Sequence, residues 1–179
     1  MASTSPPLIR LRAARQDDVP AIATLGAHIF AVTFGHSVPA SELQSYLLEF
    51  YSEAATSKDV EDPLKDLVVA VDEAEVIVGF ALLTRGTSEP CIANLENAIE
   101  LQRVYVDPMC AGQGVGRMLI GRLEEMARER DFKHIWLGVW EENIKAQEVY
   151  KRLGYSAVGD HDFTIGGIVQ TDYVMLKTL

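Results

Sequence analysis

The most informative part of the sequence is Val104-Tyr105-Val106-Asp107-Pro108-Met109-Cys110-Ala111-Gly112-Gln113-Gly114-Val115-Gly116-Arg117. It begins as a β-rich run, continues through three alternate glycines and leads into an amphipathic segment. A strand that turns through glycines into a helix leaves backbone N–H groups without partners, and these donors and the helix dipole favour an anion. Glycine also lets a ligand approach where a Cβ would intrude. The segment therefore predicts a site for a phosphate or pyrophosphate.

Spacing argues against two common phosphate-binding loops. A dinucleotide fingerprint would need glycine at position 117, which is Arg117, and a Walker loop would need Gly-Lys-Ser/Thr, which this sequence lacks. A glycine-rich helix start without a ligand remains the alternative for this segment taken alone. The rest of the chain has to decide between the two interpretations.

The composition favours one globular domain, because the chain has 179 residues and 48% of them are hydrophobic. We expect this domain to span residues 8–179, after a disordered tail at residues 1–7. No segment approaches the roughly 18 to 20 apolar residues that cross a bilayer, and residues 1–7 lack the apolar core of a secretory signal. We therefore expect no membrane partner and a cytoplasmic location.

The two cysteines, Cys91 and Cys110, predict neither a disulfide framework nor a cysteine-rich metal site, and we expect no bound metal. Cys110 lies beside the glycines, where a reactive thiol is one interpretation. No histidine adjoins it in the sequence, so a small buried side chain is the favoured role.

The formal net charge of −10 argues against nucleic acid as a partner, because phosphate backbones are bound by basic surfaces. An acidic chain is compatible with a cationic small molecule or a basic peptide. Charge that serves only solubility explains the same balance equally well.

Apolar periodicity predicts helices and strands along most of the chain. The helical pattern occurs at 22–29, 43–50, 115–126 and 146–153, and the polar run 52–66 is a loop or a weak helix. The strand pattern occurs at 9–13, 67–71, 76–83, 98–106, 135–140, 155–158 with 163–165, and 168–176. We expect an α/β (α+β) fold, with a central mixed, mostly antiparallel sheet of about seven strands and helices on both faces.

Local signals add expectations for single side chains. Asp17 or Asp18 is expected to cap the first helix, and Asn143 the last. In the helix after the glycines, Met118 belongs to the apolar face and Glu124 to the solvent face.

A second motif gives the glycine segment its context. The residues Asn143-x-x-Ala146-x-x-x-Tyr150-x-x-x-Gly154-Tyr155 follow it at a fixed distance. Together with the order of elements, the two motifs resemble the GNAT family of acetyl-CoA-dependent N-acetyltransferases. The resemblance covers nearly the whole chain and favours a ligand-binding loop.

The resemblance implies acetyl-CoA as the co-substrate. The backbone of Val104, Tyr105 and Val106 would pair with the pantetheine arm as an added strand does, and Asn143 would contact that arm from the other side. The pyrophosphate would be held by N–H groups of Gly112, Gln113, Gly114, Val115, Gly116 and Arg117. Related chains usually have Gln or Arg at the position of Ala111, so here the backbone donors would have to suffice.

The resemblance also implies a direct attack of an amine on the thioester. Tyr150 would protonate the departing thiolate, although a Tyr that faces the core is the plain alternative. A free N–H near Arg103 would stabilise charge on the carbonyl oxygen. Some relatives carry a glutamate base at the position of Gly138, so the base must be another residue here.

Glu100 is the first candidate for that base, followed by Glu141 and His161. Each has a plain alternative as a surface-strand charge, a favourable charge near a helix start or a turn residue, respectively. Any of the three is also able to act through water.

A narrower likeness concerns the acceptor. Thr33-Phe34-Gly35, Gly159-x-His161-x-Phe163 and the tail Gln170-Thr171-Asp172-Tyr173-Val174-Met175 look like PaiA-type spermidine and spermine N-acetyltransferases. This implies a polyamine or another small cationic amine as the acceptor. The charge balance fits such an acceptor, because acidic residues would surround the cleft if the two early helices and the segment 86–97 cover it, namely Glu42, Glu49, Glu53, Glu96 and Glu100. For most of these residues an ordinary solvated face is the favoured alternative. The alternatives are a protein N-terminal or lysine acetyltransferase and a non-catalytic CoA-binding regulatory module. Relatives often form homodimers, so the resemblance is also compatible with a homodimer of this chain.

Overall fold

The computed structural model describes residues 8–179, and the expectation for residues 1–7 lies outside this range. The strands are β1 (Arg10–Ala13), β2 (Lys65–Val71), β3 (Ile77–Thr84), β4 (Ala98–Val106), β5 (His134–Trp140), β6 (Ser156–Ile165) and β7 (Ile168–Thr178). The helices are α1 (Val19–Phe34), α2 (Ala40–Phe50), α3 (Glu53–Glu61), α4 (Val115–Glu129) and α5 (Ile144–Arg152). Short 3-10 turns are η1 (Gln16–Asp18), η2 (Pro90–Ile92) and η3 (Pro108–Cys110).

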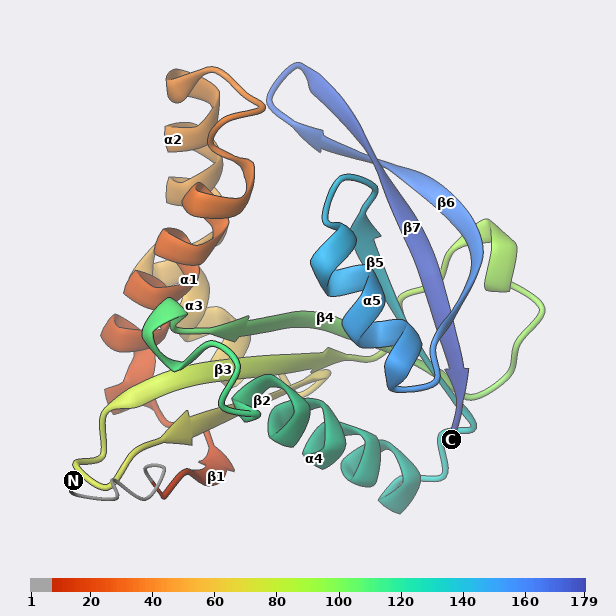
Figure 1. The fold of residues 1–179 in the computed structure, drawn as a ribbon, viewed down its shortest axis with the longest axis horizontal. Coiled ribbons are helices and arrows are strands. Elements are labelled where there is room, and N and C mark those ends of the chain that lie inside the picture. Colours follow the sequence, from red (N-terminus) through yellow and green to blue (C-terminus); the bar gives the residue numbers. More distant parts are fainter. Residues whose placement is uncertain (1–7) are drawn as a thin grey trace, which may run out of the picture.

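The seven strands form one sheet in the order β1-β2-β3-β4-β5-β7-β6 (Figure 1). The pair β4 and β5 is parallel, and the other neighbouring pairs in the described chain are antiparallel. The predicted mixed, mostly antiparallel sheet is therefore confirmed, and its antiparallel pairs include β2 with β3 and β6 with β7. Among residues 8–179, none of the helices combines the length and apolar character that a membrane span needs.

Helices cover both faces of the sheet because its central strands are apolar on both sides. In β2, Val68 and Ala70 belong to one core cluster, whereas Leu67 and Val69 belong to the other. The first cluster is completed by α4 and α5, and the second by α1 and α3 (Figure 1). Burial of these apolar surfaces is the main force that holds the helices on the sheet.

The middle of the sheet is interrupted at β4. Leu82 pairs with Arg103 and Leu83 pairs with Leu101, so Gln102 is an extra residue that bulges from β4. On its other edge, β4 pairs with β5 only from Ala98 to Glu100. Beyond that point the two strands separate (Figure 1), and we call the gap between residues 101–106 and 137–140 the β4–β5 wedge.

Two expectations near the first helix were wrong or incomplete. The run 52–66, expected as a loop or a weak helix, contains α3, which is capped by Ser52 through the N–H of Ala55 at 3.2 Å. Asp18 precedes α1 but makes no capping bond to it. Its carboxylate instead accepts two hydrogen bonds from Arg12 at 2.7 and 2.8 Å, because an arginine on β1 offers a bidentate partner.

Two expectations for α4 were also wrong. Met118 is 40% exposed, whereas Glu124 is only 6% exposed. The Glu124 carboxylate accepts hydrogen bonds from the Lys177 ammonium at 2.7 and 2.8 Å and from the Tyr155 hydroxyl at 3.1 Å. A buried carboxylate is tolerated when it has such partners, and both come from parts of the chain that helical periodicity does not show.

Candidate active site

The glycine segment joins β4 to α4 through an open turn. The Asp107 carboxylate accepts a hydrogen bond from the Met109 N–H at 2.8 Å, which starts the turn. Gly112 and Gly114 have φ angles of 79° and 85°, a region that favours glycine, and a Cβ at either would meet nothing within 4 Å. This part of the loop therefore faces open space.

The start of α4 offers the backbone donors that the sequence predicts. The helix has no side-chain cap at Gly114. Unused N–H groups, which donate to no other described residue, belong to Gly112, Gly114, Val115, Gly116 and Arg117. Gln113 differs, because its N–H donates to the Cys110 carbonyl at 3.3 Å. The uncapped donors and the helix dipole fit an anion such as a pyrophosphate.

Close packing fixes the position of this helix start on the sheet. A Cβ at Gly79 of β3 would lie 2.9 Å from the Tyr105 carbonyl oxygen and 3.2 Å from Leu119 of α4. Glycine therefore lets α4 approach β3. At Gly116 a Cβ would lie 3.6 Å from Val106, so the first turn of α4 lies against the end of β4.

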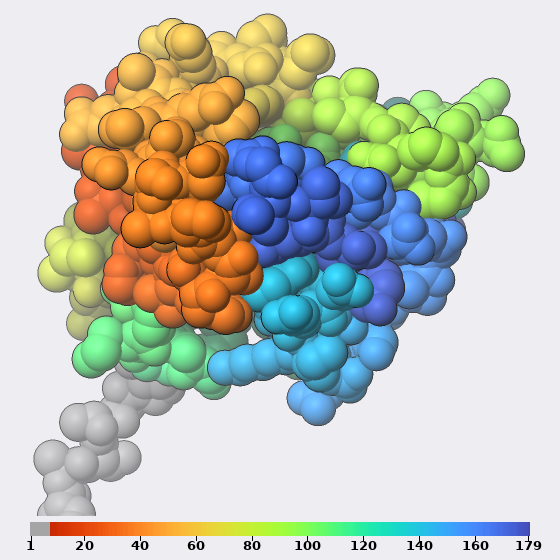
Figure 2. Space-filling view, turned by 90° about the horizontal axis from the view of Figure 1, so that it is seen from above, coloured from red at the N-terminus to blue at the C-terminus, as the bar shows by residue number. Residues whose placement is uncertain are grey.

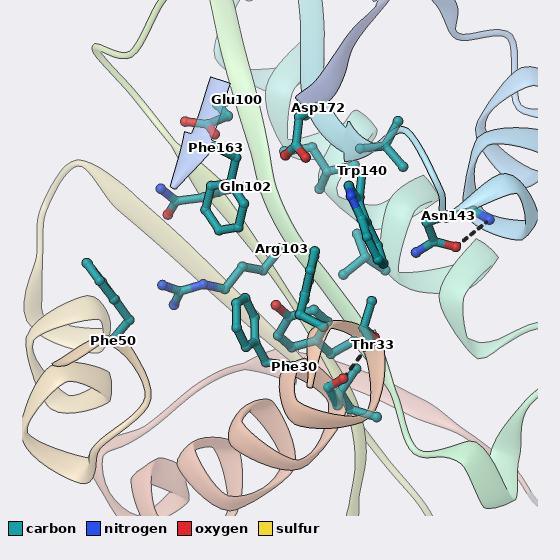
Figure 3. Close-up of a pocket in the computed structure, with 18 of the residues that line it drawn as sticks. Phe30, Thr33, Phe50, Glu100, Gln102, Arg103, Trp140, Asn143, Phe163 and Asp172 are labelled. Atoms are coloured by element: carbon teal, nitrogen blue, oxygen red, sulfur yellow. Dashed lines mark hydrogen bonds between the residues drawn. The ribbon is translucent and has the colours of Figure 1, made fainter. Parts of the chain in front are cut away.

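The β4–β5 wedge has backbone on one side and α5 on the other. Beyond Glu100, the edge of β4 that includes Val104, Tyr105 and Val106 has no strand partner toward β5. Asn143 caps α5 by accepting the Ala146 N–H at 3.2 Å, which confirms the predicted cap (Figure 3). An extended amide chain fits between such an edge and α5.

Tyr150 of α5 lines the cavity at the wedge. Its ring packs against the main core cluster and lies 5.7 Å from the Tyr155 ring in an edge-on arrangement. Its hydroxyl has no hydrogen bond to another described residue. Burial raises the pKa of Tyr150 to about 12, so the phenol stays protonated at neutral pH and is able to donate its proton.

The cavity itself has a volume of about 370 Å³ and continues from the wedge toward α1 and α2. Aromatic side chains form much of its wall: Phe30, Phe34, Tyr46, Tyr51, Trp140 and Phe163. Phe163 brings β6 to the wall, since its ring lies 5.9 Å from those of Phe34 and Tyr46. The outer surface of α2 and the β6–β7 hairpin lie side by side over this region (Figure 2).

Two carboxylates and an imidazole reach the same cavity from three strands. They belong to Glu100 on β4, His161 on β6 and Asp172 on β7, and Figure 3 shows both carboxylates at one end of the cavity. Burial raises the pKa of Glu100. Burial also raises the pKa of Asp172 to about 6, an effect that His161 opposes and Glu141 increases. The cavity thus combines an aromatic wall with a cluster of acidic groups.

Asp172 is a cavity residue that the search for a base in the sequence missed. It lies beside Gly138, where a Cβ would be 3.2 Å from the Asp172 Oδ2 atom. The space that a side chain at position 138 would use is therefore filled from β7. The sequence did hold one signal, because Asp172 alternates with Gln170 and Val174, which are buried. An acidic residue on the inner face of a strand is unusual.

A polar network that sequence reasoning also missed lies below the aromatic wall. The hydroxyls of Tyr51 and Tyr105 lie 2.5 Å apart, and the guanidinium of Arg103 lies 4.9 Å from the centre of the Tyr51 ring. Arg103 also donates to Asp59 at 2.7 Å. Because Asp59 belongs to α3, the network depends on a helix that the sequence did not clearly predict.

The remaining candidates lie outside the cavity. Glu141 is exposed in the turn before α5, and it lines neither of the two cavities. Cys110 packs against the core, and burial raises the pKa of its thiol, which argues against a reactive thiolate. Within residues 8–179, no group of three or more His, Cys, Asp or Glu side chains is placed to hold a metal.

The five glutamates expected near the acceptor cleft are only partly brought together. Glu100 lines the main cavity, and Glu49 lines a second cavity of about 410 Å³ that adjoins it at Phe50 and Arg103. Glu42 reaches over Gly166 in the β6–β7 turn. The other two line neither cavity and are exposed, namely Glu53 and Glu96.

Comparisons with known proteins show the family of this chain. The acetyltransferase (GNAT) family matches residues 29–155. An uncharacterized N-acetyltransferase of Lactobacillus delbrueckii subsp. lactis is 27% identical over 167 residues, which cover 92% of this chain and 94% of that protein. The spermine/spermidine N(1)-acetyltransferase of Bacillus subtilis is 32% identical over 71 residues, which cover 39% of this chain and 47% of that protein.

A solved structure gives the same result for the fold. The PaiA N-acetyltransferase of Thermoplasma acidophilum, in complex with coenzyme A, superimposes with a TM-score of 0.77 at 18% identity. The match covers 96% of this chain and 99% of that one. At this identity the likeness concerns the fold alone.

Proposed function

Because this chain belongs to the acetyltransferase (GNAT) family and is an N-acetyltransferase that uses acetyl-CoA, we propose that its acceptor is a polyamine or another small cationic amine. The observation that carries this proposal is the pair of carboxylates, Glu100 and Asp172, at one end of an aromatic cavity. Ammonium groups bind favourably to carboxylates and to aromatic faces. We treat residues 8–179 as one catalytic domain.

The residues at the wedge fit acetyl-CoA. In this proposal the pyrophosphate is held by the free N–H groups at the start of α4, where Gly112 and Gly114 leave open space. The Arg117 side chain is exposed in the first turn and forms no ion pair with another described residue, so it adds a positive charge there. The free edge at Val104, Tyr105 and Val106 pairs with the pantetheine arm, and Asn143 contacts that arm from α5.

The groups that line the cavity have separate roles in the reaction. Bound acetyl-CoA supplies an acetyl group on a thioester, which an uncharged amine attacks. Tyr150 gives its proton to the departing sulfur, since its hydroxyl makes no hydrogen bond to another described residue and is protonated at neutral pH. A backbone N–H of β4 near Arg103 stabilises charge on the carbonyl oxygen. Glu100 faces the cavity and remains a candidate for the group that removes the amine proton.

Two further observations support a cationic acceptor. The formal net charge of −10 attracts cations over distance, particularly at low ionic strength. The partial similarity to the spermine/spermidine N(1)-acetyltransferase of Bacillus subtilis, over 71 residues, also supports a polyamine acceptor. The proposal also includes a cytoplasmic enzyme and allows for a homodimer, whose mass is measurable by light scattering.

A panel of acceptors tests the proposal. Spermidine, spermine, an aminoglycoside and basic peptides with free N-termini are each assayed for CoA release at equal concentration. We expect kcat/KM for a polyamine to exceed that for the peptides by about tenfold or more, as one or two matched ammonium contacts would give. Rapid acetylation of peptides with no turnover of polyamines would contradict the proposed acceptor class.

A further inference from the structure

Two titratable side chains, Asp172 and His161, lie beside Gly138, and a third, Glu89, lies against His161. His161 of β6 lies between two carboxylates, with its Nε2 atom 3.8 Å from Asp172 Oδ2 and its Nδ1 atom 3.0 Å from Glu89 Oε1. Glu89 comes from the segment just before η2. A Cβ at Gly138 would lie 3.2 Å from Asp172 and 3.3 Å from His161, so glycine leaves the room that this row needs.

Two atoms of the row are buried and have no hydrogen-bond partner, namely Asp172 Oδ1 and His161 Nδ1. The His161 atom is close to Glu89, but the orientation of the two groups is not that of a hydrogen bond. A buried carboxylate oxygen without a donor is costly, and native structures rarely leave one unless a ligand or water completes it. Asp172 faces the acceptor cavity, so a donor from the acceptor is the natural partner.

We propose that Asp172 takes the proton from the acceptor ammonium, and that His161, supported by Glu89, is the residue that positions it. The inference rests on N-acetyl transfer, and it holds whether the acceptor is a polyamine or another amine. It assigns the base to β7, and Glu100 then serves to bind the cation.

The surroundings of Asp172 suit a proton acceptor. Charged and titratable groups surround it from the neighbouring elements: Glu100 from β4, Glu141 from the turn after β5, His161 from β6 and Tyr46 from α2. Glu89, from the loop before η2, lies on the far side of His161. Burial raises the pKa of Asp172 to about 6, while His161 opposes the rise. A base whose pKa lies near the working pH is ionised and still basic enough to accept a proton.

The proton transfers balance with the groups that the protein and its substrates supply. The acceptor ammonium loses one proton to the Asp172 carboxylate and becomes a neutral amine. A C–N bond forms to the acetyl carbon while its C–S bond breaks, and Tyr150 gives its proton to the sulfur. After the attack the nitrogen still carries two protons, and it loses one of them to the Tyr150 phenolate as the amide forms. The proton on Asp172 leaves to solvent. The net products are the acetamide, CoA thiol and one proton.

The test compares Asp172→Asn, Glu100→Gln and the wild-type protein by the pH dependence of kcat/KM. The assay uses whichever amine of the panel the wild type acetylates best. For the wild type we expect activity to rise as pH increases through about 6, the pKa of Asp172. For Asp172→Asn we expect kcat to fall by about 100-fold or more and this rise to disappear, as the loss of a general base predicts. Glu100→Gln should mainly raise KM for the amine and keep the rise.

Controls separate chemistry from folding. Asp162→Asn removes an exposed carboxylate from the adjacent strand and should leave the profile unchanged. Binding of acetyl-CoA to Asp172→Asn, measured by calorimetry, should equal that of the wild type, which would show an intact wedge. If Asp172→Asn keeps the wild-type profile and Glu100→Gln loses it, the proposal is overturned.

The role of His161 is tested by the pH profile of kcat/KM, because replacing a merely structural residue would not shift that profile. His161 lowers the pKa of Asp172, so His161→Gln should move the acid limb to higher pH and reduce kcat by about tenfold. Glu89→Gln should have a smaller effect in the same sense. An unmoved limb in His161→Gln would contradict the positioning role.

A second acceptor distinguishes this proposal from the proposed substrate class. An amine of low pKa is already neutral at pH 7.5 and needs no base, so the defect of Asp172→Asn should shrink with it by about tenfold or more. An equal defect with both amines would overturn the proposal. A wild type that acetylates other amines but no polyamine would contradict the substrate class and leave Asp172 open to the same test. A wild type that acetylates no amine would contradict both.

Discussion

The side of the wedge that we propose to bind acetyl-CoA is built mainly from backbone, whereas the proposed acceptor side is built from side chains. The first side consists of the edge of β4, the glycine turn and the uncapped start of α4, which are consecutive in the sequence. The second side draws on α1, α2, β4, β6 and β7, which lie far apart in the sequence. This difference indicates which positions of the chain tolerate substitution.

Backbone donors depend on conformation, so they tolerate many substitutions that keep the turn. Side-chain groups depend on identity, so one substitution at Asp172, Glu100 or Phe163 alters what the cavity accepts. We therefore expect variants on the first side to affect binding of acetyl-CoA and variants on the second to affect the amine. The following predictions test this division, from the largest effect to the smallest.

Gly114→Val should affect the backbone side most severely. Gly114 has a φ angle of 85°, which a β-branched residue rarely adopts, and its N–H is one of the free donors. We expect acetyl-CoA to bind about 100-fold more weakly or worse, because strain and loss of the donor geometry act together. Isothermal calorimetry measures the affinity.

Two matched variants sharpen that result. Gly121→Ala adds a Cβ inside α4, where it would meet nothing within 4 Å, and should leave binding unchanged. Ala111→Gln alters only a side chain near the turn and should change affinity by about threefold. If Gly114→Val and Ala111→Gln bound acetyl-CoA with equal affinity, binding by the backbone N–H groups would be contradicted.

Tyr150→Phe tests the proposed proton donor, which lies at the wedge on α5. The ring still packs on the core, but the proton donor is lost, so kcat should fall by about 100-fold with little change in affinity for acetyl-CoA. Steady-state kinetics and calorimetry together measure this. Tyr173→Phe, at a 36% exposed tyrosine, is the control and should be neutral. Full activity in Tyr150→Phe would remove the tyrosine from the mechanism.

Asp172→Asn should lower the activity but raise the stability of the folded protein at pH 7.5. Burial raises the folded-state pKa of Asp172 from 3.8 to about 6, so the folded chain binds this proton more tightly than the unfolded chain does. The favourable contribution is present below pH 3.8 and is lost as pH rises through about 6. At pH 7.5 the ionised carboxylate therefore costs stability, and Asn should raise the free energy of unfolding by about 1–3 kcal/mol.

Thermal unfolding at pH 4 and pH 7.5 measures this change in stability. We expect the gain in Tm at pH 7.5 and little gain at pH 4, where the carboxyl group is largely protonated in the folded chain. Asp162→Asn should change Tm at neither pH, because that side chain is exposed. The same gain at both pH values would show that charge is not its cause.

Phe163→Leu should have the smallest effect in the series. It removes an aromatic face from the acceptor wall while keeping an apolar side chain of similar size. We expect KM for a cationic amine to rise about fivefold and affinity for acetyl-CoA to stay the same. Phe132→Leu, at a partly buried core position outside the cavity, is the matched control. A larger effect on acetyl-CoA than on the amine would contradict the division of the wedge.

The sequence predicted the backbone side well because its signals are local. Three alternate glycines after a β-rich run indicate a turn with free N–H groups, and Asn143 indicates a cap, and the structure has both. The order and type of the strands were also predictable, because alternation and hairpin turns are short-range patterns.

The acceptor side was less predictable because it depends on contacts between distant residues. Asp172 faces the cavity only because Gly138 of β5 leaves room and β6 brings His161 beside it. The same holds for Glu124, whose burial follows from Lys177 on β7. In each case a polar residue looks like surface in the sequence and finds its partner only in the folded sheet.

A crystal structure of the protein with CoA and spermidine would test the central claim most directly. The account predicts the pyrophosphate at the free N–H groups of the α4 start and the reactive amine nitrogen about 3 Å from an Asp172 oxygen. A nitrogen bound to Glu100 alone, with Asp172 turned away, would contradict it.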